Sequence, residues 1–221
     1  MSYKTFNTSR QNDIELLKSQ GLKPEHKILD IGCGGGRLGH SLINYLNSGN
    51  YYGFDKQAGW IKNFKRDVAN ARLQDKNPTI LNCDFNWPIN RGIKFDYAYA
   101  YSVFSHVDPD LVKLCLQNLR KHFEDSSILF ASYCPNQSED TFSTQGGVHD
   151  RGGGEFVEVW YNPSFFDSIL NECGMRQVPF SSAVDKIGPG NALVDPSKKP
   201  TTTGRFANQG SYQQIIAIKK K

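Results

Sequence analysis

From residue 27 onward, short apolar runs alternate with stretches of helical periodicity, and this alternation constrains the fold more than any other feature. Strands that alternate with helices along a chain form a parallel sheet, with the helices crossing over its faces. The runs expected to form strands are 27–31, 50–55, 78–84, 94–104, 127–133, 176–182 and 211–219. The sequence therefore predicts an α/β fold with a sheet of seven strands.

Apolar side chains at helical spacing, together with helix start and stop signals, mark the helices around these strands. The expected helices are a leading one within residues 1–26, one from about Gly36, one that carries Trp60 to Val68, one that starts at Asp108-Pro109, and one over 163–174 closed by Gly174. The side chains expected to face the core include Ile14, Leu17, Leu42, Trp60, Ile61, Phe64, Val68, Leu111, Leu114, Cys115, Leu119 and Phe123. Two long segments without a regular pattern, 134–163 and 181–210, are expected to be loops.

Length and composition limit the number of domains, the compartment and the partners. At 221 residues the chain can bury one sizeable core, so residues 1–221 are expected to form a single domain. No apolar run reaches about 18 residues and no signal-peptide pattern is visible, which predicts a cytoplasmic protein without a membrane segment. Five cysteines without a C-x-x-C pair fit a reducing compartment and predict no metal site. The net charge of +4 is mild, so charge neither implies nor excludes nucleic acid as a partner, and the oligomeric state stays open.

A glycine-rich stretch, ILDIGCGGGRLG at residues 28–39, follows the first expected strand and can be interpreted in two ways. From Gly34 it fits the G-x-G-x-x-G fingerprint of a dinucleotide site, whereas from Asp30 it fits another kind of cofactor. Asp30 decides between them, because its carboxylate would repel a pyrophosphate by several kcal/mol at about 4 Å and an effective dielectric near 20. A cationic ligand is therefore favoured at this loop.

The stretch ILDIGCGGG resembles the first motif of the class I S-adenosylmethionine-dependent methyltransferases, and the resemblance extends from about Leu16 to Lys219. It implies a Rossmann-like three-layer sandwich with a mostly parallel sheet of seven strands, of which the last is antiparallel. It also implies S-adenosyl-L-methionine as the cofactor and S-adenosyl-L-homocysteine as the product. An antiparallel last strand would place the two long loops, 134–163 and 181–210, on the face where the methyl group lies.

Residues at the ends of successive strands match the cofactor-binding positions of this family. The resemblance implies that Asp30 lies near the methionine ammonium group and that Asp55 accepts hydrogen bonds from both ribose hydroxyls. It implies that Asp84 receives the adenine amino group, with Phe85 beside the ring. The full cofactor-binding set is Asp30, Gly32, Cys33, Gly34, Asp55, Lys56, Asp84, Phe85, Tyr101 and Ser102. For Asp55 or Asp84 taken singly, the alternative is a turn or a helix cap.

Methyl transfer from a sulfonium is an in-line displacement, so holding the acceptor near the methyl carbon supplies much of the catalysis. If the acceptor is a hydroxyl, a histidine can take its proton as the new bond forms. His106, just past the fourth strand, is the first candidate for this base, and His149 is the second. The alternative for His106 is a helix cap or a wall of the cofactor pocket. Arg151, Trp160 and Tyr161 are expected to contact the acceptor, unless they are surface turn residues.

Missing motifs narrow the acceptor. No N-P-P-Y-like tetrapeptide follows the fourth strand, where YSVF stands, which disfavours methylation of nucleic-acid bases and of glutamine. Paired acids placed for the magnesium of catechol-type enzymes are also missing. A small polar molecule or a glycan hydroxyl is what these observations favour. Two alternatives stay open, a nicotinamide-dependent oxidoreductase and a cofactor-binding subunit without acceptor chemistry.

Overall fold

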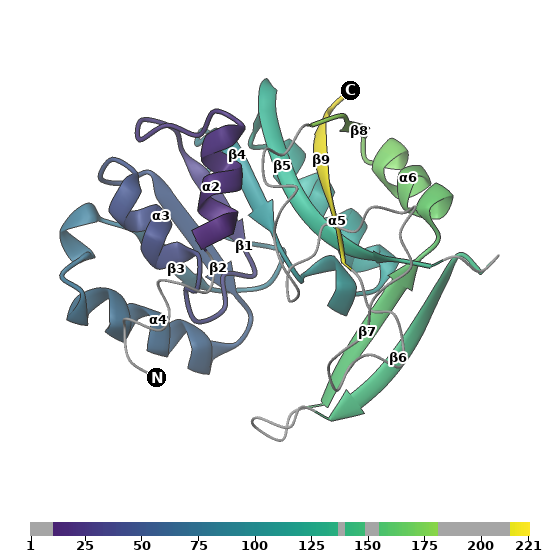
Figure 1. Ribbon diagram of the computed structural model, residues 1–221, viewed down its shortest axis with the longest axis horizontal. Coiled ribbons are helices and arrows are strands. Elements are labelled where there is room, and N and C mark those ends of the chain that lie inside the picture. The colour runs from purple at the N-terminus through teal and green to yellow at the C-terminus, as the bar shows by residue number, and fades with distance from the viewer. Residues whose placement is uncertain (1–10, 137–139, 149–154, 181–212) are drawn as a thin grey trace.

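The chain is built around one sheet (Figure 1), and the computed structural model describes residues 11–136, 140–148, 155–180 and 213–221. The seven expected strands are β1 (Ile28–Ile31), β2 (Tyr51–Asp55), β3 (Thr79–Asn82), β4 (Phe95–Ala100), β5 (Phe123–Pro135), β8 (Met175–Val178) and β9 (Gln214–Lys220). They lie in the order β3-β2-β1-β4-β5-β9-β8, with β1 to β5 parallel and β9 antiparallel to both its neighbours. The mostly parallel sheet with an antiparallel last strand is confirmed.

Helices cover both faces of this sheet. They are α2 (Gln11–Ser19), α3 (Gly39–Tyr45), α4 (Ala58–Asn70), α5 (Pro109–Arg120) and α6 (Pro163–Glu172), with short 3-10 helices η1 (Gln74–Lys76) and η2 (Phe104–His106). One hydrophobic cluster joins the sheet to α2, α3 and α4, and a second joins it to α5 and α6. The three-layer sandwich is therefore confirmed. Within the part of the chain that the structure describes, no helix is both long and apolar enough to cross a membrane.

Strand β1 shows how the sequence produces this arrangement. Successive side chains of a strand point to opposite faces, and Leu29 and Ile31 accordingly join the α5 and α6 cluster while Ile28 joins the other. All four residues of β1 are buried, because both faces of a parallel sheet are covered. Asp30 is the one charged residue among them, so its burial needs a specific partner.

Two side chains expected in the core are exposed instead. Trp60 is 58% exposed, because the buried stripe of α4 runs through Ile61, Phe64 and Val68 and leaves position 60 at its side. Leu111 is 36% exposed in the first turn of α5. In both helices the buried stripe begins one residue later than expected, at Ile61 in α4 and at Val112 in α5.

The segment 134–163 was expected to be a loop, and this was wrong. Its described residues form a hairpin of β6 (Phe142–Val148) and β7 (Glu155–Tyr161), paired antiparallel from Phe142–Tyr161 to Val148–Glu155. Strand β7 also pairs in parallel with the end of β5, where Cys134 faces Trp160. The hairpin projects from the sheet in Figure 1. The other expected loop, 181–210, lies outside the described residues.

Candidate functional site

A tight glycine loop follows β1 and leads to α3. Gly32 and Gly34 have φ angles of +65° and +54°, in the left-handed region that glycine adopts without steric cost. A Cβ atom on Gly34 would lie 2.6 Å from a ring carbon of Trp60, and one on Gly32 would lie 2.6 Å from a methyl carbon of Val103. Both positions therefore require glycine, and the loop backbone is packed closely against α4 and the segment after β4.

Asp55 ties this loop to the end of β2. One carboxylate oxygen accepts the Gly34 backbone N–H at 3.1 Å, and the other accepts the Gln57 backbone N–H at 2.8 Å. A carboxylate offers about four acceptor positions, so these two bonds leave capacity for two further donors. The side chain is half-buried at the carboxyl end of a parallel strand, where ligands of such sheets bind. The vicinal hydroxyls of a ribose fit this acceptor.

Asp30 and Cys33 lie on the inner side of the loop. Asp30 is 4% exposed, and its carboxylate accepts the Tyr51 hydroxyl at 2.8 Å. Burial, and then the charges of Asp30 and Asp55, raise the pKa of the Cys33 thiol. The thiol therefore stays protonated and is no nucleophile. The buried negative charge of Asp30 gives the end of β1 an electrostatic preference for a cationic ligand.

The ends of β2 and β3 place the remaining residues of the expected adenosine region. Lys56 is exposed, and its carbonyl accepts the Asn82 side-chain amide at 3.0 Å. Asp84 is exposed, and its carboxylate accepts the Asn86 backbone N–H at 2.8 Å, which closes a local turn. Phe85 belongs to the core, with its ring 6.3 Å from that of Phe54. Contacts of these three residues with the cofactor stay predictions.

Beyond β4, the backbone bends at Ser102. Its φ of +57° is unusual for a residue with a side chain, and such conformations persist where surrounding contacts hold them. The Ser102 backbone N–H donates to the hydroxyl of the fully buried Ser132 at 2.7 Å. Tyr101, one residue earlier, is half-buried, with its ring stacked 6.3 Å from that of Tyr99.

Four side chains around this bend form a hydrogen-bond chain in which each donor can be assigned. The Ser132 hydroxyl donates to the Gln213 carbonyl oxygen at 2.6 Å, and the Gln213 amide donates to the Ser102 hydroxyl oxygen at 2.9 Å. The Ser102 hydroxyl proton is then directed at His106 Nε2, at 3.4 Å. The chain joins β5, the start of β9, the end of β4 and η2.

The hairpin fixes the tautomer of His106. Its Nδ1 lies 2.9 Å from the Val157 carbonyl oxygen, which can only accept, so Nδ1 carries the proton. In the neutral ring, Nε2 therefore presents its lone pair on the Ser102 side. His106 thus holds an acceptor for a hydroxyl proton at the junction of β4 and the hairpin, which is the geometry a general base requires.

The other predicted acceptor residues have different outcomes. His149 and Arg151 lie outside the described residues. Trp160 is half-buried on β7, beside the end of β5. Tyr161 was expected to contact the acceptor, but its side chain has no exposed surface, its hydroxyl donates to the Val107 carbonyl, and its ring packs 5.3 Å from that of Phe166. We assign Tyr161 to the core, because a side chain buried in this way has no face for a substrate.

Sequence reasoning missed two residues of this region. Gln213 has no local signal, because it reaches Ser102 across 111 positions of the chain. Trp60 was taken for a core residue, although its exposed ring packs against the glycine loop at Gly34. Among the described residues, no group of three His, Cys, Asp or Glu side chains could hold a metal ion.

Comparisons with known proteins define the class. Residues 29–129 match the family model described as a methyltransferase domain. A S-adenosylmethionine-dependent methyltransferase from Clostridium acetobutylicum has a similar structure, with a TM-score of 0.65 and 16% identity over 100% of this chain and 92% of that one. Magnesium protoporphyrin IX methyltransferase from Synechocystis, with bound S-adenosylmethionine, gives a TM-score of 0.61 and 15% identity over 99% and 79% of the two chains. These likenesses show the fold.

A curated relative, an uncharacterized protein of Rickettsia prowazekii, is 31% identical over 113 residues. The match covers 48% of this chain and 42% of the relative, so it spans less than half of either. Residues 29–129 therefore match a methyltransferase domain, within a fold shared by solved S-adenosylmethionine-dependent methyltransferases. Solved structures of the similar Synechocystis enzyme hold S-adenosylmethionine or S-adenosylhomocysteine, and the methyltransferase match disfavours the nicotinamide alternative.

Proposed function

We propose that this chain transfers the methyl group of S-adenosylmethionine to a hydroxyl of a small polar or carbohydrate-like molecule, with His106 as the general base. The fixed Nδ1 proton of His106 is the observation that carries the proposal, because it leaves Nε2 as the proton acceptor. The fold alone does not identify the acceptor, since the similar structures include a porphyrin methyltransferase and a glycopeptide methyltransferase.

The cofactor half of the site is assigned as follows. S-adenosylmethionine supplies an electrophilic methyl group on a sulfonium. Asp55 accepts the ribose hydroxyls, which the two unused acceptor positions of its carboxylate support. Asp30 contributes negative charge toward the cationic methionine part. The closely packed backbone at Gly32 and Gly34 supports an assignment as the floor of the cofactor site, with no Cβ in the way.

The remaining predicted residues keep supporting roles in the proposal. Asp84 and Lys56 lie at the ends of β3 and β2, where the adenine is expected. Tyr101 and Ser102 flank the methionine part, which the bend in the backbone at Ser102 supports. Trp160, half-exposed on the hairpin beside the end of β5, is retained as an acceptor contact. A cytoplasmic location and a single domain also stay predictions.

The acceptor is proposed to take the place of the Ser102 hydroxyl in front of His106. As the new bond forms, the acceptor oxygen loses its proton to Nε2, and the positive charge on the ring is stabilised by the Val157 carbonyl oxygen at Nδ1. The Gln213 amide keeps its hydrogen bond to the Ser102 hydroxyl and so holds the bend, while the Val157 carbonyl holds the ring. Holding the acceptor in line with the methyl group supplies the rest of the rate.

The test starts with a survey of small-molecule and glycan fractions for transfer of a radiolabelled methyl group. With an acceptor in hand, His106→Asn is the informative variant, because an asparagine amide can still donate toward Val157 but offers no imidazole base. We expect turnover to fall by about 100-fold or more while the affinity for S-adenosylhomocysteine stays the same. His26→Asn, at a histidine that contacts the Lys23 backbone, is the matched control and should be fully active.

Two outcomes would overturn the proposal. Normal turnover in His106→Asn would show that His106 is not the general base. Tight binding of S-adenosylhomocysteine with no methylated product from any fraction would favour the cofactor-binding subunit without acceptor chemistry.

A further inference from the structure

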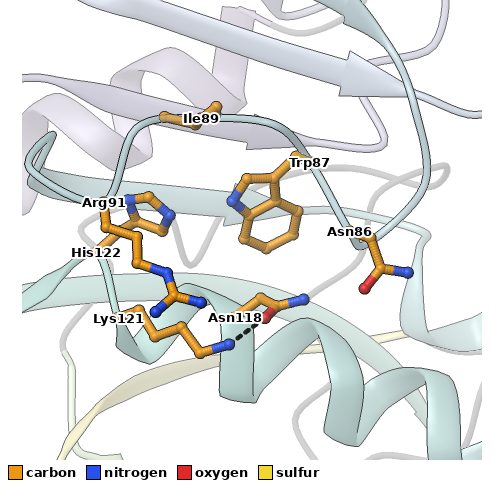
Figure 2. Close-up of a pocket in the computed structure, with 7 residues that line it drawn as sticks. All are labelled: Asn86, Trp87, Ile89, Arg91, Asn118, Lys121 and His122. Carbon is orange, nitrogen blue, oxygen red and sulfur yellow. Dashed lines mark hydrogen bonds between the residues drawn. The ribbon is translucent and has the colours of Figure 1, made fainter.

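A cavity lies between the segment that joins β3 to β4 and the C-terminal end of α5 (Figure 2). It is lined by Asn86, Trp87, Ile89, Arg91, Asn118, Lys121 and His122. The His122 backbone carbonyl accepts the Phe95 N–H at the start of β4, so the cavity extends toward the amino end of that strand. None of the seven belongs to the proposed cofactor or acceptor set.

The lining is rich in cations and hydrogen-bond donors and contains no carboxylate. Figure 2 shows the Arg91 guanidinium extending beside the cavity toward Asn118, and the Trp87 indole and the His122 ring facing each other across it. The centroids of these two rings lie 6.3 Å apart. Lys121 Nζ donates a hydrogen bond to the side-chain oxygen of Asn118, Oδ1, at 2.6 Å. The nearby Lys94 is paired with Glu124, outside the lining.

The inner wall is desolvated. Trp87 is 7% exposed and His122 is 3% exposed. Burial lowers the pKa of His122, a hydrogen bond to the Ile93 carbonyl opposes this, and the charges of Lys94, Lys121 and Arg91 lower it further. The protein thus gathers positive charge around a buried ring without supplying an anion among the lining residues. Lys121 lies at the C-terminus of α5, where a cation interacts favourably with the helix dipole, so this residue alone does not indicate a ligand. Arg91 and the Trp87 indole N–H come from the segment between β3 and β4, so the dipole of α5 does not explain their position at the cavity.

The volume limits the size of the ligand. The cavity holds about 210 Å³, which equals about seven water molecules at roughly 30 Å³ each. Sites for drug-sized ligands start near 300 Å³, so the ligand is smaller than these. A tetrahedral oxyanion matches the fork of an arginine together with an ammonium group.

We propose that this cavity binds a phosphate group, either free or as the ester of a small molecule, at a site separate from the methyl-transfer site. Arg91 and Lys121 hold the charge, and the Trp87 indole N–H donates to a phosphate oxygen. The proposal does not depend on the proposed function.

The test follows the three indole N–H signals by nuclear magnetic resonance in the full chain, saturated with S-adenosylhomocysteine, while inorganic phosphate is added at constant ionic strength. A Trp87→Phe variant identifies the Trp87 signal. We expect this signal to shift and saturate, and Arg91→Gln to weaken the affinity at least about tenfold, the scale for a hydrogen bond to a charged group. Phenyl phosphate in parallel distinguishes an ester from the free ion by its tighter binding.

Arg66→Gln is the matched control, because Arg66 lies on α4 and pairs with Asp67 at 3.1 Å. It should leave the phosphate affinity unchanged. A Trp87 signal that does not move, or that shifts equally in Arg91→Gln or on addition of chloride alone, would overturn the proposal.

Discussion

The two halves of the proposed methyl-transfer site are built in different ways. In the cofactor half, residues 28–102, the predicted residues stand at or just after the ends of β1, β2, β3 and β4, and the pairing of these strands brings the ends together. In the acceptor half, which consists of η2 and the segments from β5 to β9, the residues around His106 are placed by contacts between distant segments. His106 and Val157 are 51 positions apart, and Ser102 and Gln213 are 111 positions apart. Local sequence patterns therefore determine the first half, and long-range pairing determines the second.

The largest expected effect concerns the attachment of the hairpin. Tyr161→Ala should lower the free energy of unfolding by about 3 to 5 kcal/mol, because it removes a fully buried aromatic ring that packs on Phe166. Tyr161→Phe should cost about 1 kcal/mol, the net value of the hydrogen bond to the Val107 carbonyl. Urea denaturation followed by circular dichroism measures both. If Tyr161 contacts the acceptor instead, stability will hold and the Michaelis constant for the acceptor will rise.

A smaller effect is expected at the junction of the halves. Gln213→Leu should lower turnover about tenfold, because it breaks both hydrogen bonds that position Ser102 opposite His106, with a net loss of about 1.4 kcal/mol. Steady-state kinetics of methyl transfer, together with the affinity for S-adenosylhomocysteine, measures it. The exposed neighbour Gln214→Leu is the control and should remain active. Equal loss of cofactor affinity and turnover in Gln213→Leu would show that the residue supports the fold and not the base.

The smallest effect tests a feature that the sequence predicted directly. Asp108 caps α5, and its carboxylate accepts the Leu111 backbone N–H at 2.9 Å, with Pro109 in the first turn. Asp108→Ala should cost about 1 kcal/mol of stability with turnover nearly unchanged. Thermal unfolding measures the loss. A large loss of turnover without a loss of stability would mean that this cap belongs to the acceptor site.

The same difference explains how far the sequence could predict the molecule. The core of β1 and the position of Asp55 follow from apolar runs and their ends, so both were predictable. The hairpin was missed because the segment 142–148, FSTQGGV, has few apolar residues, and the glycines at 146, 147 and 152–154 are typical of turns. Phe85 and Tyr161 could not be recognised as core residues, because their burial depends on partners elsewhere in the chain, Phe54 for the first and Val107 for the second.

The central claim is that cofactor binding and proton removal belong to separate halves of one site. Calorimetric titration of S-adenosylhomocysteine into Asp55→Ala and into His106→Asn tests it most directly. The account predicts that Asp55→Ala loses about 1.5 to 3 kcal/mol of binding free energy, since it removes a charged hydrogen-bond acceptor, while His106→Asn binds like the unaltered chain. Equal weakening in both variants, or unchanged affinity in Asp55→Ala, would contradict it.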